Sequence, residues 1–82
     1  MNALRDQINA ALNTLFQRNP ALCGFSVRQD LSFSEVACHP ALYGEDEREL
    51  INDISGVLDE LLEEQPDAAE LLRGRTLARR VH

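Results

Sequence analysis

Two cysteines and two histidines are the residues of this chain with the most versatile chemistry. Cys23 and Cys38 lie 15 residues apart, His39 follows directly, and His82 ends the sequence. Thiolates and imidazoles bind zinc, and paired thiols exchange disulfides. A zinc site uses about four ligands, usually supplied as close pairs, whereas these residues are scattered. We therefore expect both cysteines to be small apolar side chains on strands, and a thiol-redox or metal-binding module is the alternative interpretation.

A row of carboxylates is the stronger feature. Residues 45–70 contain eleven acidic residues and one base, Arg48, for a net charge of −10. Several of these acids repeat at four-residue spacing, where like charges on a helix cost about 0.2–0.5 kcal/mol per pair. Either burial of the apolar side outweighs this repulsion and leaves a solvated surface, or a cationic group lies against it. The acidic residues expected to make such a contact are Glu49, Asp53, Glu60, Glu63 and Glu64.

The chain then becomes basic. Residues 71–82 carry four arginines and no acid, and residues 1–44 are neutral, so the total of −6 conceals three differently charged segments. Pairing of Arg75, Arg79 and Arg80 with the acidic helix, in the same chain or in a second copy, would account for both charge runs. Net acidity argues against binding to nucleic acid or to anionic lipid, because both require a basic surface.

Catalytic arrangements are missing from the sequence. The serines lack a glycine-flanked nucleophile turn, and the glycines are isolated, so no phosphate-binding loop is predicted. Acid–base chemistry on the paired carboxylates would need an enclosed pocket that shifts the pKa of one of them. A chain of 82 residues has little structure with which to enclose such a pocket. We expect a non-enzymatic protein without a cofactor.

Length and composition indicate one globular domain. The chain has 82 residues and 9.2 kDa, with 44% hydrophobic and 27% charged residues. Neither a secretory signal pattern nor an apolar run of about 18 residues occurs, so a cytoplasmic protein without membrane contact is expected. We divide the chain into a domain at residues 1–74 and a basic C-terminal arm at residues 75–82.

Apolar spacing predicts the first helix and a hairpin. Residues 3–18 carry apolar side chains at three- and four-residue intervals, and Asn19-Pro20 ends the helix. Residues 22–29 and 33–39 alternate as strands, with Cys23, Phe25 and Val27 on one face. A two-residue loop would place Cys23 opposite Cys38. We favour a four-residue loop, which places Phe25 opposite Cys38, because Asp30-Leu31 suits a tight turn poorly.

A second amphipathic helix is predicted to begin at Asp46, with Glu49 completing a capping box, and a short third helix covers residues 67–73. The fold class is therefore α+β, in the order α-β-β-α-α, with both long helices on one sheet face. The expected core consists of Ile8, Leu12, Leu15, Phe25, Val27, Val36, Ile54, Leu58 and Leu61.

The hairpin has a consequence for partners, because two strands alone are rarely stable and expose their edges. Either the C-terminal segment adds a third strand, or two copies pair their edges. We expect a homodimer or another protein at the sheet edge. The predicted function is a small protein-interaction module, such as an adaptor, chaperone-like protein or regulatory subunit. An inhibitor that imitates nucleic acid with its carboxylates is a third possibility.

Overall fold

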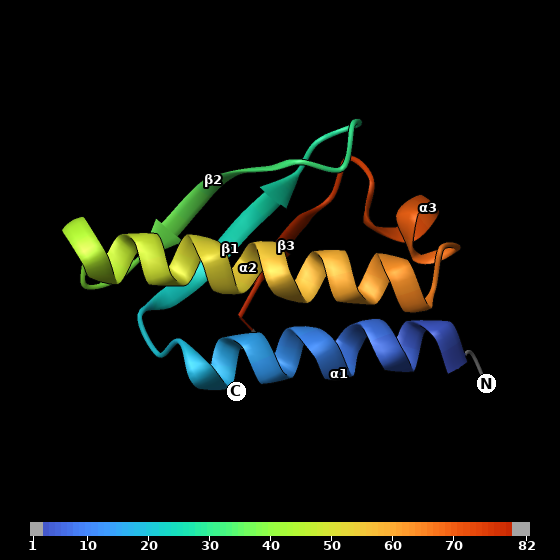
Figure 1. Ribbon diagram of the computed structural model, residues 1–82, viewed down its shortest axis with the longest axis horizontal. Helices are drawn as coiled ribbons and strands as arrows, with labels where there is room; N and C mark the ends of the chain where they lie inside the picture. The colour runs from blue at the N-terminus through green and yellow to red at the C-terminus, as the bar shows by residue number, and fades with distance from the viewer. Residues whose placement is uncertain (1–2, 80–82) are drawn as a thin grey trace.

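Two long helices packed on one face of a small antiparallel sheet form the fold, which confirms the predicted α+β class and element order (Figure 1). The computed structural model describes residues 3–79. The elements are α1 (Ala3–Arg18), β1 (Leu22–Val27), β2 (Phe33–Cys38), α2 (Gly44–Glu64), α3 (Ala68–Leu72) and β3 (Thr76–Ala78). None of the described helices has the length and hydropathy needed to cross a membrane.

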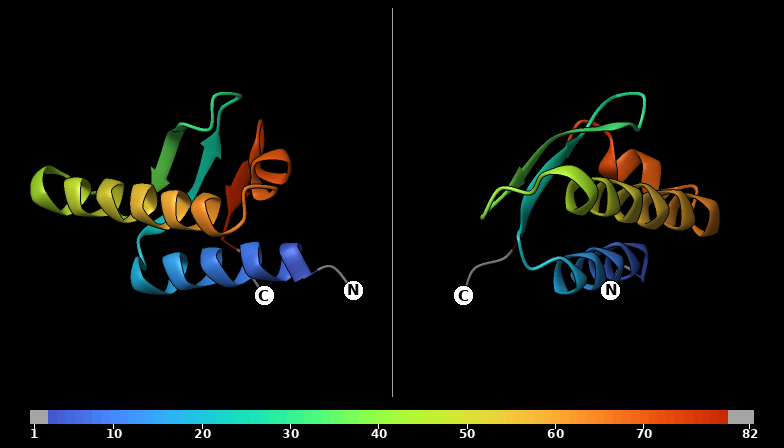
Figure 2. Two further views of the ribbon diagram at one scale, coloured as in Figure 1. Left: turned by 45° about the vertical axis from the view of Figure 1, so that its right-hand side comes forward. Right: turned by 60° about the vertical axis from the view of Figure 1, so that its left-hand side comes forward.

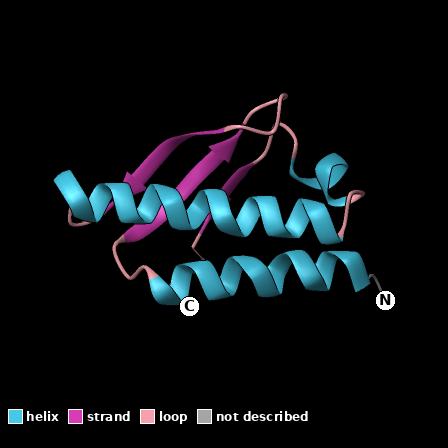
Figure 3. Cartoon of the chain, viewed as in Figure 1, coloured by secondary structure: helices cyan, strands magenta, loops and turns pink. Residues whose placement is uncertain are grey.

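The sheet has the strand order β2-β1-β3, so the central strand is β1. Phe25 of β1 pairs with Leu77 of β3, and the Val27 amide donates to the Arg75 carbonyl at 2.7 Å. The C-terminal segment thus supplies the third strand, and residues 76–78, which were predicted to lie in a basic arm, belong to the sheet. Figures 2 and 3 show both long helices on the same side of the three strands.

The hairpin forms neither of the two registers considered from the sequence. The Arg28 amide donates to the Ser32 carbonyl at 2.7 Å, and the Leu31 amide donates to the Arg28 carbonyl at 3.0 Å. These bonds close a three-residue loop whose last residue, Leu31, has a φ of 71°. Such a loop normally places glycine at that position, so the sequence carried no signal for it.

Irregular pairing between β1 and β2 changes which side chains face the helices. The register shifts between Leu22 and Gly24 and again between Gly24 and Ser26, and Glu35 on the partner strand has a φ of 53°. As a result Leu22 and Phe25 are both buried, and Cys23 is exposed. The prediction that Cys23 shares a face with Phe25 was wrong, because a bulge breaks the two-residue alternation.

The helix boundaries follow the sequence at α1 but not at the start of α2. α1 ends at Arg18, before Asn19-Pro20 as predicted, and the Asn19 side chain donates to the Leu15 carbonyl at 2.9 Å. α2 begins at Gly44, which has a φ of 61°, and no side chain caps it. The predicted capping box at Asp46 was wrong, since Asp46 already lies inside the first turn.

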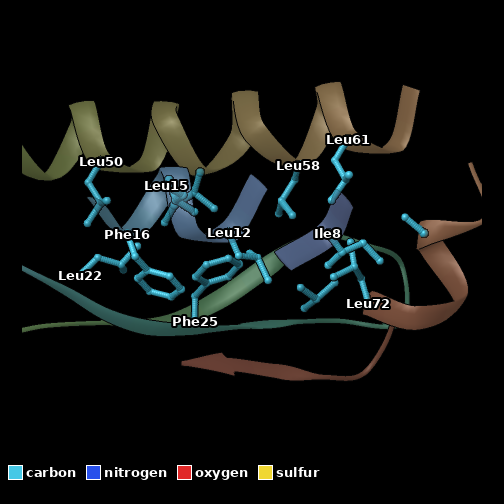
Figure 4. Close-up of a cluster of buried hydrophobic side chains, with 13 residues drawn as sticks. Ile8, Leu12, Leu15, Phe16, Leu22, Phe25, Leu50, Leu58, Leu61 and Leu72 are labelled. Carbon is cyan, nitrogen blue, oxygen red and sulfur yellow. The ribbon is translucent and has the colours of Figure 1, made fainter. Parts of the chain in front are cut away.

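The core lies between the helices and the sheet (Figure 4). Every predicted core residue is buried except Val36, which is half-buried on the edge strand β2. Three aromatic rings run through it, with Phe25 6.5 Å from Phe16 and 6.2 Å from Phe33 between ring centres. The buried apolar residues outside the predicted core are Phe16, Leu22, Leu50, Ala68 and Leu72.

Candidate functional site

The acidic face of α2 is the candidate site. The helix carries nine carboxylates and one base, Arg48. Its apolar side is buried through Leu50, Ile54, Leu58 and Leu61, so the packing of the helix fixes which side chains remain outside. Eight of the nine carboxylates are exposed, and Asp53 is half-buried. Glu49, Glu60, Glu63 and Glu64, which the sequence singled out, are among the exposed ones.

Asp53 is held by the end of α1. The Arg18 guanidinium forms an ion pair with its carboxylate, and the Asn19 side-chain amide donates to the other carboxylate oxygen at 2.6 Å. No other carboxylate of α2 forms an ion pair within residues 3–79. Among the described residues, ion pairing of the α2 carboxylates is therefore confined to Asp53. Its cationic partner, Arg18, belongs to α1 and not to the C-terminal segment.

Arg79 makes a different contact from the one expected. Its Nε donates to the Leu22 carbonyl at 3.0 Å, and its Nη2 donates to the Phe16 and Asn19 carbonyls at 2.8 Å each. The guanidinium also lies 5.2 Å from the centre of the Phe16 ring. Arg79 thus caps the C-terminal end of α1, where carbonyls lack helical partners and a cation is favoured.

Arg73 and Arg75, the other described arginines of the C-terminal segment, do not pair with α2 either. Arg73, which directly follows α3, approaches Glu70 of that helix, with 3.8 Å between Nη1 and Oε1, and Arg75 is exposed. Among the described residues, the expected pairing of this segment with the acidic helix is therefore not formed within the chain, and pairing with a second copy stays a prediction. Arg80 and His82 lie outside the described residues.

A groove of about 470 Å³ runs between α1 and α2. Small side chains of α1, among them Ala10, Ala11 and Thr14, form one wall. Val57 contributes an apolar patch from α2, and the exposed Glu60 and Glu64 carboxylates lie beside it. Arg18 also lines the groove. The arrangement combines a shallow apolar floor with an acidic wall.

The two thiols are not bonded to each other. Cys23 is exposed, Cys38 is half-buried, and both are free, while the observed register places Leu22 rather than Cys23 opposite Cys38. Burial raises the pKa of the Cys38 thiol, and the neighbouring Cys23 and Glu47 act in the same direction. Within residues 3–79, no three His, Cys, Asp or Glu side chains are grouped so that they could hold a metal ion.

A polar cluster ties the three strands together on the sheet face away from the helices. The Ser26 hydroxyl donates to the Glu35 carboxylate at 3.2 Å and lies 3.1 Å from the Thr76 hydroxyl. These three residues belong to β1, β2 and β3 respectively, so the cluster connects every strand. These hydrogen bonds satisfy the side chains of Ser26, Glu35 and Thr76, so the cluster needs no catalytic explanation. Because the three residues are far apart in the chain, their spacing in the sequence does not predict the cluster.

No protein-family model, curated protein or solved structure matches this chain. Functional conclusions therefore depend on the surfaces of the molecule. Of these, the acidic face of α2 combines the largest concentration of charge with an adjoining apolar groove.

Proposed function

We propose that this chain is a small, non-enzymatic protein-interaction module, of the adaptor, chaperone-like or regulatory type, that binds a cationic segment of a partner protein. The observation that carries the proposal is the row of eight exposed carboxylates on α2 that have no cationic partner within residues 3–79. Like charges at four-residue spacing destabilise a helix. A bound cationic segment would remove that repulsion.

The groove between α1 and α2 indicates the shape of the partner segment. Its small side chains, such as Ala10 and Ala11, allow a second backbone to approach closely, and Val57 offers apolar contact. An amphipathic helix with basic residues beside its apolar stripe fits both features. Glu60 and Glu64 would meet the basic residues, and such charge complementarity raises the association rate and sets specificity.

A matched pair of charge variants tests the proposal. The probe is a synthetic amphipathic helical peptide of leucine and lysine, and its binding is measured by fluorescence anisotropy at low and physiological salt. Replacing Glu60 and Glu64 by lysine should weaken binding about tenfold or more, which corresponds to about 1.4 kcal/mol. The control replaces Glu45 and Asp46 by lysine, which changes the net charge equally at the other end of α2.

Two outcomes would contradict the proposal. If both double variants weaken binding equally, the peptide responds only to net charge and the groove is not its site. If the unaltered protein does not bind the peptide at low salt, where screening is weakest, the acidic face does not act as a docking surface for a basic helix.

A further inference from the structure

α2 is longer than the sheet beneath it requires. Its 21 residues span about 31 Å at about 1.5 Å per residue, whereas the outer strands of a three-stranded sheet are about 10 Å apart. The first buried residue of α2 is Leu50, and residues 44–49 are all exposed. These residues extend past β2 in Figure 1 and in the left view of Figure 2. The overhang is about 9 Å long, which leaves room for one further strand.

β2 is an edge strand, since β1 is its only neighbour in the described sheet. Such an edge presents backbone amides and carbonyls that another strand can pair with. The space beside it is an apolar groove of about 460 Å³, lined by Val36 and Cys38 of β2, by Leu42, and by Leu50 and Ile51 of α2. Unpaired backbone and unfilled apolar surface thus meet at one place.

The exposed apolar side chains concentrate at the same place. Within residues 3–79, the large apolar residues left exposed are Tyr43 at 78% and Ile51 at 38%. Ile51 lines the groove, and Tyr43 follows the groove residue Leu42 directly in the chain. A strand placed under the overhang would cover these side chains, because every second residue of a strand faces the same side.

We propose that the β2 edge and this groove bind an extended segment of another protein as a fourth strand, with apolar residues alternating with basic ones. Its inward side chains would fill the groove between β2 and Ile51, and a basic residue would pair with Glu47, which lines the groove. The backbone of the segment would hydrogen-bond to β2, the mode of strand addition to an exposed edge.

The charge around the β2 edge favours a segment of another protein, rather than a second copy of this chain, as the fourth strand. The overhang contains Glu45, Asp46, Glu47 and Glu49 against Arg48 alone. In a second copy, β2 would bring Glu35 and no base, and each chain carries a net charge of −6. Like charges placed opposite each other across strands are destabilising, whereas a basic segment is attracted.

This inference rests on the proposed function only in treating the chain as an interaction module, since its surface is separate from the groove between α1 and α2. The probe is a short peptide of alternating valine and lysine, with an alternating valine–glutamate peptide as its control. Hydrogen exchange of the full chain is followed by NMR. The basic peptide should slow exchange of β2 amides about tenfold or more, and the acidic peptide should not.

Two variants separate the surfaces. Replacing Tyr43 and Ile51 by serine should weaken binding of the basic peptide about tenfold, and because both side chains are exposed, the circular dichroism of the protein should not change. Replacing Glu60 and Glu64 by lysine should leave the slowed exchange of β2 amides in place. In sedimentation, the protein with bound peptide should contain one copy of this chain.

Three results would overturn the inference. The first is unchanged exchange of β2 amides with the basic peptide. The second is loss of peptide binding in the Glu60 and Glu64 variant alone, which would locate binding at the acidic face of α2 and leave the proposed function standing. The third is a dimer of this chain that the peptide dissociates, which would make a second copy the occupant of the edge.

Discussion

Replacement of Arg79 by alanine should destabilise the fold far more than removal of a neighbouring surface charge. The Arg79 side chain donates three hydrogen bonds to the carbonyls of Phe16, Asn19 and Leu22. Two of these carbonyls belong to the end of α1 and the residue after it, where helical partners are missing. In the variant, the Asn19 carbonyl keeps its bond from the Leu22 amide at 2.9 Å, but water must replace the bonds from Arg79. The half-buried setting of Arg79 allows water to do so only in part.

The magnitude follows from these contacts. A hydrogen bond to a charged group contributes about 1.5–3 kcal/mol when buried, and partial access of water reduces this to about 1 kcal/mol for each of the three. The contact with the Phe16 ring, 5.2 Å away, adds about 0.5 kcal/mol. These contributions amount to about 3.5 kcal/mol, and because the Asn19 carbonyl keeps the Leu22 amide as a donor, the expected loss is about 3 kcal/mol. A domain of 82 residues has a total unfolding free energy of about 4–12 kcal/mol, so the variant loses a quarter or more of it.

Thermal and urea unfolding followed by circular dichroism measure the effect. A loss of about 3 kcal/mol lowers the Tm by about 12–24 °C in a domain of this size. Arg75→Ala is the matched control, because it removes the same charge from an exposed side chain and should change stability by less than about 0.5 kcal/mol. Arg79→Lys should fall between the two, since lysine keeps the charge but not the planar fork of donors.

Equal unfolding free energies for Arg79→Ala and Arg75→Ala would refute the reasoning. The hydrogen bonds of Arg79 would then be no stronger than those that water makes with the same carbonyls. An Arg79→Lys variant as stable as the unaltered protein would show instead that charge at the end of α1, rather than the three directed bonds, stabilises this region.

Two further predictions concern glycines and thiols. Gly74→Ala should lower the unfolding free energy measured in urea by about 1 kcal/mol, because Gly74 has a φ of 74° and an added Cβ would lie 2.7 Å from Gln29 Nε2. Gly56→Ala, which places its Cβ in open space within α2, should raise the unfolding free energy by about 0.5–1 kcal/mol. A change of the same sign in both variants would contradict this explanation. Maleimide should label Cys23 faster than Cys38, because burial raises the pKa of Cys38 and so lowers its thiolate fraction at any pH below that raised value. Cys23→Ser should remove the fast phase and leave the slow one, whereas loss of the slow phase would refute the assignment.

The helices could be predicted from the sequence because their signals are local. The apolar spacing of α1 ends at Asn19-Pro20, and both the spacing and the proline act within a few residues. The acidic face of α2 was predictable for the same reason, since charges four residues apart on a helix are neighbours. The start of α2 was missed because Gly44 adopts a left-handed φ of 61° and the helix begins there without a side-chain cap.

The sheet was harder to predict, because its register depends on packing between distant residues. Burial of both Leu22 and Phe25 against the helices requires a bulge, which turns Cys23 outward. Leu31 takes a positive φ that its side chain disfavours, and it packs against the core. The contacts of Arg79 could not be predicted from the sequence either. Its partners are backbone carbonyls, and because every residue has one, no residue type marks which carbonyls it binds.

The position of β3 in the sheet affects how the chain folds during its synthesis. While residues up to α3 emerge, β1 has β2 on one side only, and its other edge remains free to pair with a strand of another nascent chain. That edge closes when residues 76–79 arrive and the Arg79 amide donates to the Cys23 carbonyl. Because contacts between such distant residues form slowly, the interval before β3 docks is when this protein is most exposed to misassembly.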